Sequence, residues 1–119
     1  MTELSPAEVI RRHVAAFNAR DLDALMAGFT DDAAWVTGVT ALRGRDELTV
    51  LFRDAMTQLL PSLTIDTLLA DGNRVACQLT ETLTANGERH TFPLAGFYQI
   101  RGGRIATAKI YREGTADLP

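Results

Sequence analysis

The spacing of apolar residues changes once along the chain, at Pro61, and this change constrains the fold more than any other feature of the sequence. Before Pro61, apolar residues recur every three or four positions, as on one face of a helix. After it, apolar and polar residues alternate, as in strands with one buried face. Segregated helices and strands pack as separate layers. The pattern therefore predicts an α+β fold in which three N-terminal helices pack on a curved antiparallel sheet.

The helical half begins with two clear start signals. Ser5 is predicted to cap a first helix that runs to about residue 19, and the following proline suits the first helical position. Asp21 is predicted to cap a second, short helix whose apolar face includes Phe29. A short strand, 33–37, and a third helix complete this half. Gly44 precedes that helix, whose apolar positions run from Leu48 to Leu59, and Pro61 ends it.

The second half predicts a meander of four strands. Asp71-Gly72, Asn86-Gly87 and Gly102-Gly103 are residue pairs typical of tight turns between antiparallel neighbours. The predicted strands are 63–69, 74–84, 90–100 and 104–112. We expect the third helix to cross the concave face of this sheet and the bent sheet to leave a conical cavity at its open end.

Composition narrows the class of protein. The 119 residues favour one domain, 1–119. The net charge of −3, with no basic cluster, argues against nucleic acid as a partner. No apolar run approaches the roughly 20 residues that a membrane helix needs, and the first residues do not resemble a secretory signal. The single cysteine, Cys77, fits a reducing compartment, so we expect a cytoplasmic protein with no membrane partner.

Several common chemistries are unsupported by the sequence. His13 and His90 are the only histidines, and no Cys/His cluster suggests a metal site. The glycines lie at turns and form no phosphate-binding or dinucleotide-binding motif. Cys77 lies in the middle of a strand, where a buried inert thiol is expected. We therefore predict no metal and no cofactor.

Glu81 is the most informative residue for function. Residues 75, 77, 79, 81 and 83 share one face of the long predicted strand, and Glu81 is the only charged one. A buried carboxylate is costly unless it is paired, and burial moves such groups toward the pKa range useful for acid–base catalysis. Two alternatives remain open: a bulge that turns Glu81 outward, and a structural ion pair, for example with Arg112.

His13 lies beside the apolar stripe of the first helix and is predicted to face Glu81 across the cavity, directly or through one water or ligand atom. A histidine can then act with the acid in proton transfer; the alternative is a core histidine. The predicted catalytic pair is Glu81 and His13. Phe17, on the apolar stripe of the first helix, and Leu79, on the same strand face as Glu81, are predicted to shape the pocket. So are Trp35 and Thr37, which share one face of the first strand, and Tyr98, which shares a face of its strand with Leu94 and Ile100.

Four segments carry a resemblance to a known family: residues 12–23, 29–33, 43–47 and 103–111. In order and spacing they resemble the nuclear transport factor 2-like superfamily, in its SnoaL-like and ketosteroid isomerase-like branch. The resemblance implies a cone-shaped α+β fold with one pocket. Members include isomerases, polyketide cyclases, epoxide hydrolases, dehydratases and proteins without known catalysis, so it implies no single activity.

Residue by residue, the resemblance argues against the known isomerase mechanism. The positions of the isomerase's tyrosine, catalytic aspartate and second aspartate correspond to His13, Thr37 and Ala95-Gly96. In the limonene epoxide hydrolase branch, the inward tyrosine and asparagine of the first strand correspond to Trp35 and Thr37. Of that branch's charged positions, Glu81 matches an acid, whereas Ile110 and Leu79 stand where it has its second acid and its arginine.

These observations favour a cofactor-free enzyme that performs acid–base chemistry of the isomerase, cyclase or hydrolase type. Its expected substrate is an apolar ring compound, such as a polyketide, a terpenoid or a steroid-like molecule. The alternative is a non-catalytic small-ligand-binding or dimerisation module of the same fold.

The outer face of the long strand is uncharged and β-branched, and related proteins commonly pair through such sheets, so we predict a homodimer through the convex face. The residues on this outer face of the long strand are Gln78, Thr80, Thr82 and Thr84.

Overall fold

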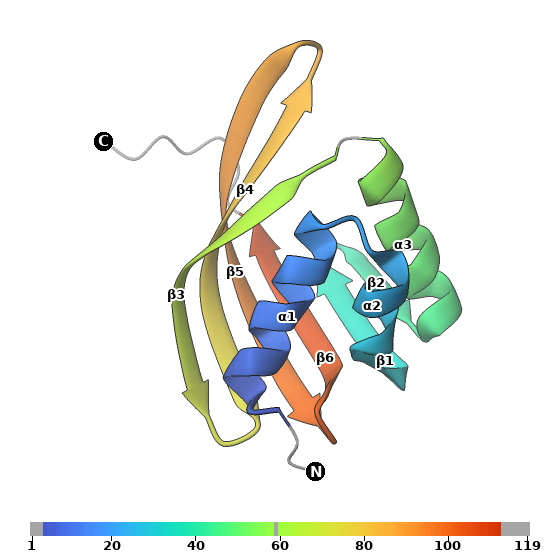
Figure 1. Cartoon of the computed structure of the whole chain (residues 1–119), viewed down its shortest axis with the longest axis vertical. Coiled ribbons are helices and arrows are strands. Elements are labelled where there is room, and N and C mark those ends of the chain that lie inside the picture. The colour runs from blue at the N-terminus through green and yellow to red at the C-terminus, as the bar shows by residue number, and fades with distance from the viewer. Residues whose placement is uncertain (1–3, 59, 113–119) are drawn as a thin grey trace.

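Figure 1 shows the computed structural model, which describes residues 4–58 and 60–112. Within these residues there are three helices: α1 (Pro6–Asn18), α2 (Leu22–Ala27) and α3 (Arg45–Thr57). The strands of the same described part are β1 (Phe29–Thr37), β2 (Thr40–Arg43), β3 (Ser62–Asp71), β4 (Arg74–Ala85), β5 (Glu88–Arg101) and β6 (Arg104–Arg112). The predicted α+β class is confirmed, with a hairpin of β1 and β2 inserted before the third helix.

The predicted caps start the first two helices. The Ser5 hydroxyl accepts a hydrogen bond from the backbone N–H of Glu8 at 3.2 Å. The Asp21 carboxylate accepts one from the backbone N–H of Ala24 at 3.1 Å. Each bond satisfies a donor that the first helical turn leaves without an intrahelical partner. The chain therefore enters α1 and α2 at the residues that local sequence signals indicate.

The six strands form one sheet in the order β2-β1-β6-β5-β4-β3. Strands β3 to β6 form the predicted antiparallel meander. At the turn between β4 and β5, Asn86 and Gly87 both have positive φ, as a two-residue hairpin of this kind requires. The sheet differs from a wholly antiparallel one in a single pairing, because β6 returns beside β1 and runs parallel to it.

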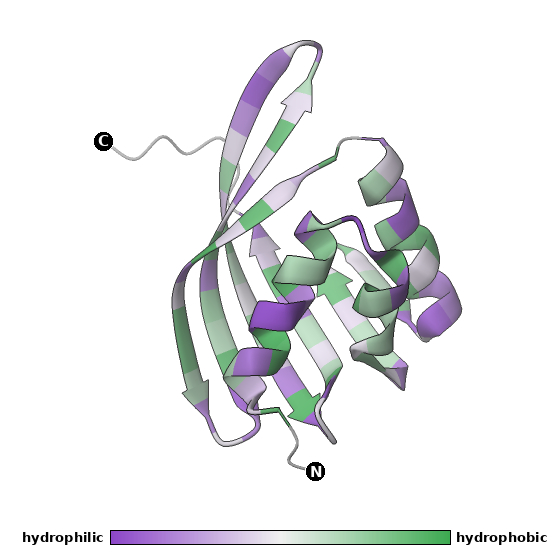
Figure 2. Cartoon of the chain, in the orientation of Figure 1, coloured by the Kyte–Doolittle hydropathy of each residue, from purple (hydrophilic) through white to green (hydrophobic). Residues whose placement is uncertain are grey.

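The concave face of the sheet is crossed by α1 and not by α3 (Figure 1). Helix α1 packs against β3, β4 and β6, whereas α3 packs against β1 and β2 at the other end of the sheet. Our expectation for the third helix is met only in part: α3 borders the concave side, but its short connection from the β1–β2 hairpin keeps its backbone near those two strands. Figure 2 shows hydrophobic and hydrophilic residues alternating along the meander, and the buried positions of β4 follow the same alternation.

Several element boundaries differ from the sequence prediction. Phe29 belongs to β1 and not to α2, because Gly28 ends that helix and Phe29 is wholly buried beside Ile105 of β6. The spacing of Phe29 from the apolar residues of α2 suits a helix, but its strand pairing decides its place. The sequence pattern does not predict the short strand β2. Helix α3 ends at Thr57, and the predicted helical residue Leu59 lies outside the described residues.

Candidate active site

A cavity of about 140 Å³ lies on the concave side of the sheet, between α1, α3 and the inner face of the strands. All seven residues that the sequence predicts for the site line it: His13, Phe17, Trp35, Thr37, Leu79, Glu81 and Tyr98. The other lining residues are Leu51, Phe52, Ala55, Pro61, Leu63, Leu94, Ile110 and Arg112. Apolar and aromatic side chains therefore surround one carboxylate and one guanidinium group.

Glu81 points inward, as its strand parity predicts. It is 8% exposed, and the β4–β5 register runs through it without a shift, so the alternative of an outward-turning bulge at Glu81 is wrong. Arg112 of β6 lies on the other side of β5 and donates hydrogen bonds from both terminal nitrogens to the two carboxylate oxygens of Glu81. The second alternative, an ion pair with Arg112, is thus confirmed.

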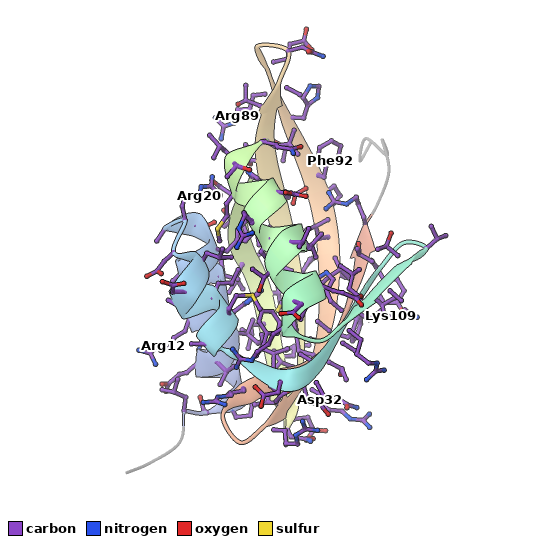
Figure 3. The ribbon with its side chains drawn as sticks, turned by 90° about the vertical axis from the view of Figure 1, so that its right-hand side faces the viewer. Arg12, Arg20, Asp32, Arg89, Phe92 and Lys109 are labelled. Atoms are coloured by element: carbon purple, nitrogen blue, oxygen red, sulfur yellow. The ribbon has the colours of Figure 1, made fainter. Side chains whose placement is uncertain are left out.

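Arg112 lies between the buried carboxylate of Glu81 and the solvent. Its side chain is 44% exposed, whereas that of Glu81 is 10% exposed. The guanidinium also lies over the ring of Phe92, with its central carbon 6.0 Å from the ring centre; Phe92 is labelled on β5 in Figure 3. This contact and the ion pair hold Arg112 against the sheet. The site is therefore a charge-compensated carboxylate at the edge of an apolar cavity.

His13 is a neutral member of the aromatic wall. Its ring lies within 5.6–6.3 Å, centre to centre, of four aromatic rings: Phe29, Trp35, Phe52 and Tyr98. Burial among these rings lowers the pKa of His13 to about 4. Its Nδ1 atom is buried and has no hydrogen-bond partner among the described residues. The imidazole is therefore uncharged at neutral pH.

The predicted pair of His13 and Glu81 is only partly seen. Both line the cavity, but no direct hydrogen bond between them is present in the described part of the chain, where the partner of Glu81 is Arg112. Contact through a bound molecule stays a prediction. Arg112, which the sequence offers only as an alternative partner, is the charged residue that completes the site.

Tyr98 brings a hydroxyl group to the cavity. It is 4% exposed and packs against the rings of His13 and Trp35. Burial, and to a lesser degree the nearby Cys77, raises the pKa of Tyr98 above its ordinary value, so its hydroxyl keeps its proton at neutral pH. Tyr98 can therefore donate a hydrogen bond to a ligand.

Gly96 leaves the space that Tyr98 occupies. A Cβ atom built on Gly96 would lie 2.5 Å from the Tyr98 oxygen and 2.7 Å from its ring. Because Tyr98 is packed on both sides, it cannot swing away freely. We expect Gly96→Ala to lower the free energy of unfolding by about 1–3 kcal/mol through overpacking. Urea denaturation measures this loss, and Ala95→Gly, on the opposite face of β5, is the control for altered strand propensity. An unchanged stability in Gly96→Ala would mean that Tyr98 is free to move.

Asn18, the last residue of α1, and Arg20, just after it, hold the segment that forms one wall of the cavity. The Asn18 side chain exchanges two hydrogen bonds of 2.8 Å with the backbone of Leu63. The Arg20 guanidinium donates to the carbonyl oxygens of Leu60 and Pro61. Pro61 and Leu63 line the cavity, so these contacts fix one of its walls. Sequence reasoning missed both residues, because their partners are backbone groups that carry no sequence signal.

Other sequence predictions concern groups away from this centre. Cys77 is buried, and burial raises its pKa to about 11, which agrees with an unreactive thiol. Tyr111 lies on the outer face, where its ring packs on Phe97. Within residues 4–58 and 60–112, no group of His, Cys, Asp and Glu is arranged to hold a metal ion. No helix in this part of the chain is long and apolar enough to cross a membrane.

Solved structures share this fold at low sequence identity. An epoxide hydrolase of M. tuberculosis, described as LEH-like, is 23% identical with a TM-score of 0.83, over 91% of this chain and 82% of that one. An NTF2-like protein of unknown function from Burkholderia pseudomallei is 22% identical with a TM-score of 0.84, over 92% of each chain. A Catenulispora acidiphila protein with a ketosteroid isomerase-like fold, in complex with trimethylamine, is 19% identical with a TM-score of 0.80, over 87% and 84%.

These likenesses establish the fold, an NTF2-like cone. No curated protein matches the sequence at a significant level. The model of the SnoaL-like domain family matches residues 10–108, which span α1 to β6 and include Glu81, His13 and most of the cavity. The match therefore covers most of the chain, and the protein belongs to the SnoaL-like domain family.

Proposed function

We propose that the protein is a cofactor-free enzyme that transfers protons on a small, mostly apolar molecule bound in the concave cavity. The observation that carries this proposal is the carboxylate of Glu81, a residue that is 8% exposed, in a cavity lined almost wholly by apolar side chains. Structures of similar fold named epoxide hydrolase and polyketide cyclase support an enzymatic role. The free, buried thiol of Cys77 suits the cytoplasm as the site of action.

In this proposal Glu81 is the proton acceptor and later the donor. Its carboxylate takes a proton either from a carbon of the substrate or from a water molecule beside the substrate, and it returns the proton to another substrate atom. Arg112 compensates the charge of the carboxylate and holds both of its oxygens in place by donating a hydrogen bond to each. Tyr98 donates a hydrogen bond to charge that develops on a substrate oxygen. Neutral His13 serves as a hydrogen-bonding wall and does not supply positive charge.

Two small probe molecules test this role and do not depend on the identity of the natural substrate. We expect the protein to accelerate deuterium exchange next to the carbonyl of cyclohexanone in D₂O, followed by NMR, or the opening of cyclohexene oxide. Glu81→Gln should reduce the accelerated rate by about 100-fold or more, as expected when a general base is lost. The matched control is Glu47→Gln on α3, outside the cavity, which should retain the wild-type rate.

The non-catalytic alternative is favoured by one observation. The Glu81 charge is already compensated by Arg112, and such pairs also occur as purely structural features. If neither probe reacts faster than in buffer, or if Glu81→Gln is as active as the wild type, the small-ligand-binding module becomes the better account.

We also propose that two copies pair through the convex face of the sheet. A hollow of about 470 Å³ lies on that face, lined in part by Leu69 and Phe97. Both of these residues are at least half exposed, as is Tyr111, whose ring packs on Phe97. Contiguous exposed apolar surface of this kind marks interaction sites. We expect sedimentation to show a dimer at micromolar concentration and Phe97→Arg to yield a monomer. Val50→Arg, at an exposed apolar position on α3, should leave the dimer intact; a monomeric wild type would contradict the proposal.

A further inference from the structure

The cavity is smaller than the pockets in which proteins usually enclose a ligand. Its volume is about 140 Å³, whereas pockets that enclose drug-sized ligands measure about 300–1,000 Å³. An engineered protein cavity of about 150 Å³ holds one benzene molecule. The available space therefore suits one six-membered ring, and the polyketide or steroid-like substrate expected from the sequence is too large for it.

Aromatic side chains fill the inner end of the cone. Trp35 and Phe52 meet edge to face with their ring centres 5.1 Å apart, and Phe29 stacks on Phe52 at 5.6 Å. His13 packs among these same rings. Each of these side chains is less than one-tenth exposed, so none is free to fold out of the way. The free volume that remains is bordered by Glu81 and Arg112 among its lining residues.

The polar groups of the cavity restrict the ligand further. The Glu81 carboxylate can only accept hydrogen bonds when ionised, whereas the Arg112 guanidinium can only donate them. A ring hydroxyl can donate to Glu81, and a ring carbonyl can accept from Arg112 or Tyr98. A charged group elsewhere on the ring would meet an apolar wall, where an unpaired charge is costly.

From this geometry we infer that the ligand is a single-ring compound carrying one hydroxyl or carbonyl group. The inference rests on the proposed function for its catalytic meaning, since it names the substrate class of the same site. Its test uses binding alone, so its outcome is independent of turnover. If the protein does not accelerate the probe reactions, the size limit on the ligand can still hold. If the size limit fails, the proposed proton transfer by Glu81 can still hold.

The experiment compares saturated alcohols of increasing size: cyclohexanol, the two-ring 2-decalol and a four-ring androstanol. These compounds do not absorb where tryptophan does, and Trp35 is both the only tryptophan and part of the cavity wall. Its fluorescence therefore reports occupation of the cavity directly. We expect cyclohexanol to bind at least about tenfold more tightly than either larger alcohol, because overpacking a rigid core is unfavourable.

Enlarging the cavity should relax this selectivity. Phe52→Ala on α3 removes an inner wall while keeping the Trp35 reporter, and 2-decalol should then bind at least about tenfold more tightly than to the wild type. Leu79→Ala, on β4, enlarges the cavity from the sheet side and serves if Phe52→Ala does not fold. Leu48→Ala is the matched control, because Leu48 is wholly buried on α3 but does not line the cavity.

The result that supports the inference is a preference for one ring in the wild type and in Leu48→Ala that disappears in a cavity-enlarging variant. Equal or tighter binding of 2-decalol or androstanol by the wild type would overturn it. So would an unchanged preference in both Phe52→Ala and Leu79→Ala, because the named walls would then not set the limit.

Discussion

Replacing Arg112 with leucine is expected to lower the free energy of unfolding by about 2–3 kcal/mol at pH 7. The substitution leaves the carboxylate of Glu81, whose side chain is 10% exposed, without the cation that compensates it. Removing one partner of a fully buried pair costs about 3–5 kcal/mol, and we expect less here because the Arg112 side chain is 44% exposed. Chemical denaturation of the single variant against the wild type measures the loss.

Two controls separate this effect from a general loss of charge. Arg101→Leu removes the arginine of a solvent-exposed pair with Asp32, and such pairs contribute about 0–1 kcal/mol. The double variant Glu81→Leu/Arg112→Leu removes both charges and should recover most of the stability, because apolar replacements of a buried pair are often neutral. A double variant less stable than Arg112→Leu would contradict the view that the unpaired carboxylate causes the loss.

Acidification should destabilise the fold through His13. Its pKa falls from the ordinary value of 6.5 to about 4 in the folded protein. Between these values the unfolded chain binds more protons than the folded one, so stability rises with pH across this window. A difference of this size corresponds to a loss of about 3 kcal/mol as the pH falls from 7 to 4.

The measurement is the free energy of unfolding at several pH values between 7 and 5, where most carboxylates stay ionised. We expect His13→Leu to remove most of the slope in this interval. His90→Gln is the matched control, because it removes the other histidine, which lies half-buried beside Phe92 on β5, and the slope should persist. A wild-type stability that does not change between pH 7 and 5 would show that His13 is reached by water in the folded state.

Most of the fold follows from local sequence signals. The caps at Ser5 and Asp21 and the turn at Asn86-Gly87 are short-range features, and each lies at the predicted residues. The place of α3 and the parallel pairing of β1 with β6 join residues far apart in the sequence. No local pattern specifies such contacts, so sequence patterns do not predict these two features.

The same distinction applies to the site. Strand alternation is enough to place Glu81 inside and to bring Leu79 and Tyr98 to the same cavity. The ion pair with Arg112 depends on the β4-β5-β6 register, so sequence reasoning offers it only as one alternative. The cavity's size depends on how the aromatic rings pack around His13, which residue types alone do not determine.

The central claim is that a ligand in the concave cavity meets the Glu81 carboxylate. The most direct test is ¹³C NMR of the glutamate side-chain carboxyl groups, with the Glu81 signal assigned by its loss in Glu81→Gln, during titration with cyclohexanol. The account predicts a saturable shift of the Glu81 signal that follows the change in Trp35 fluorescence. Saturable binding that leaves the Glu81 signal unmoved would contradict it, because the ligand would then lie away from the carboxylate.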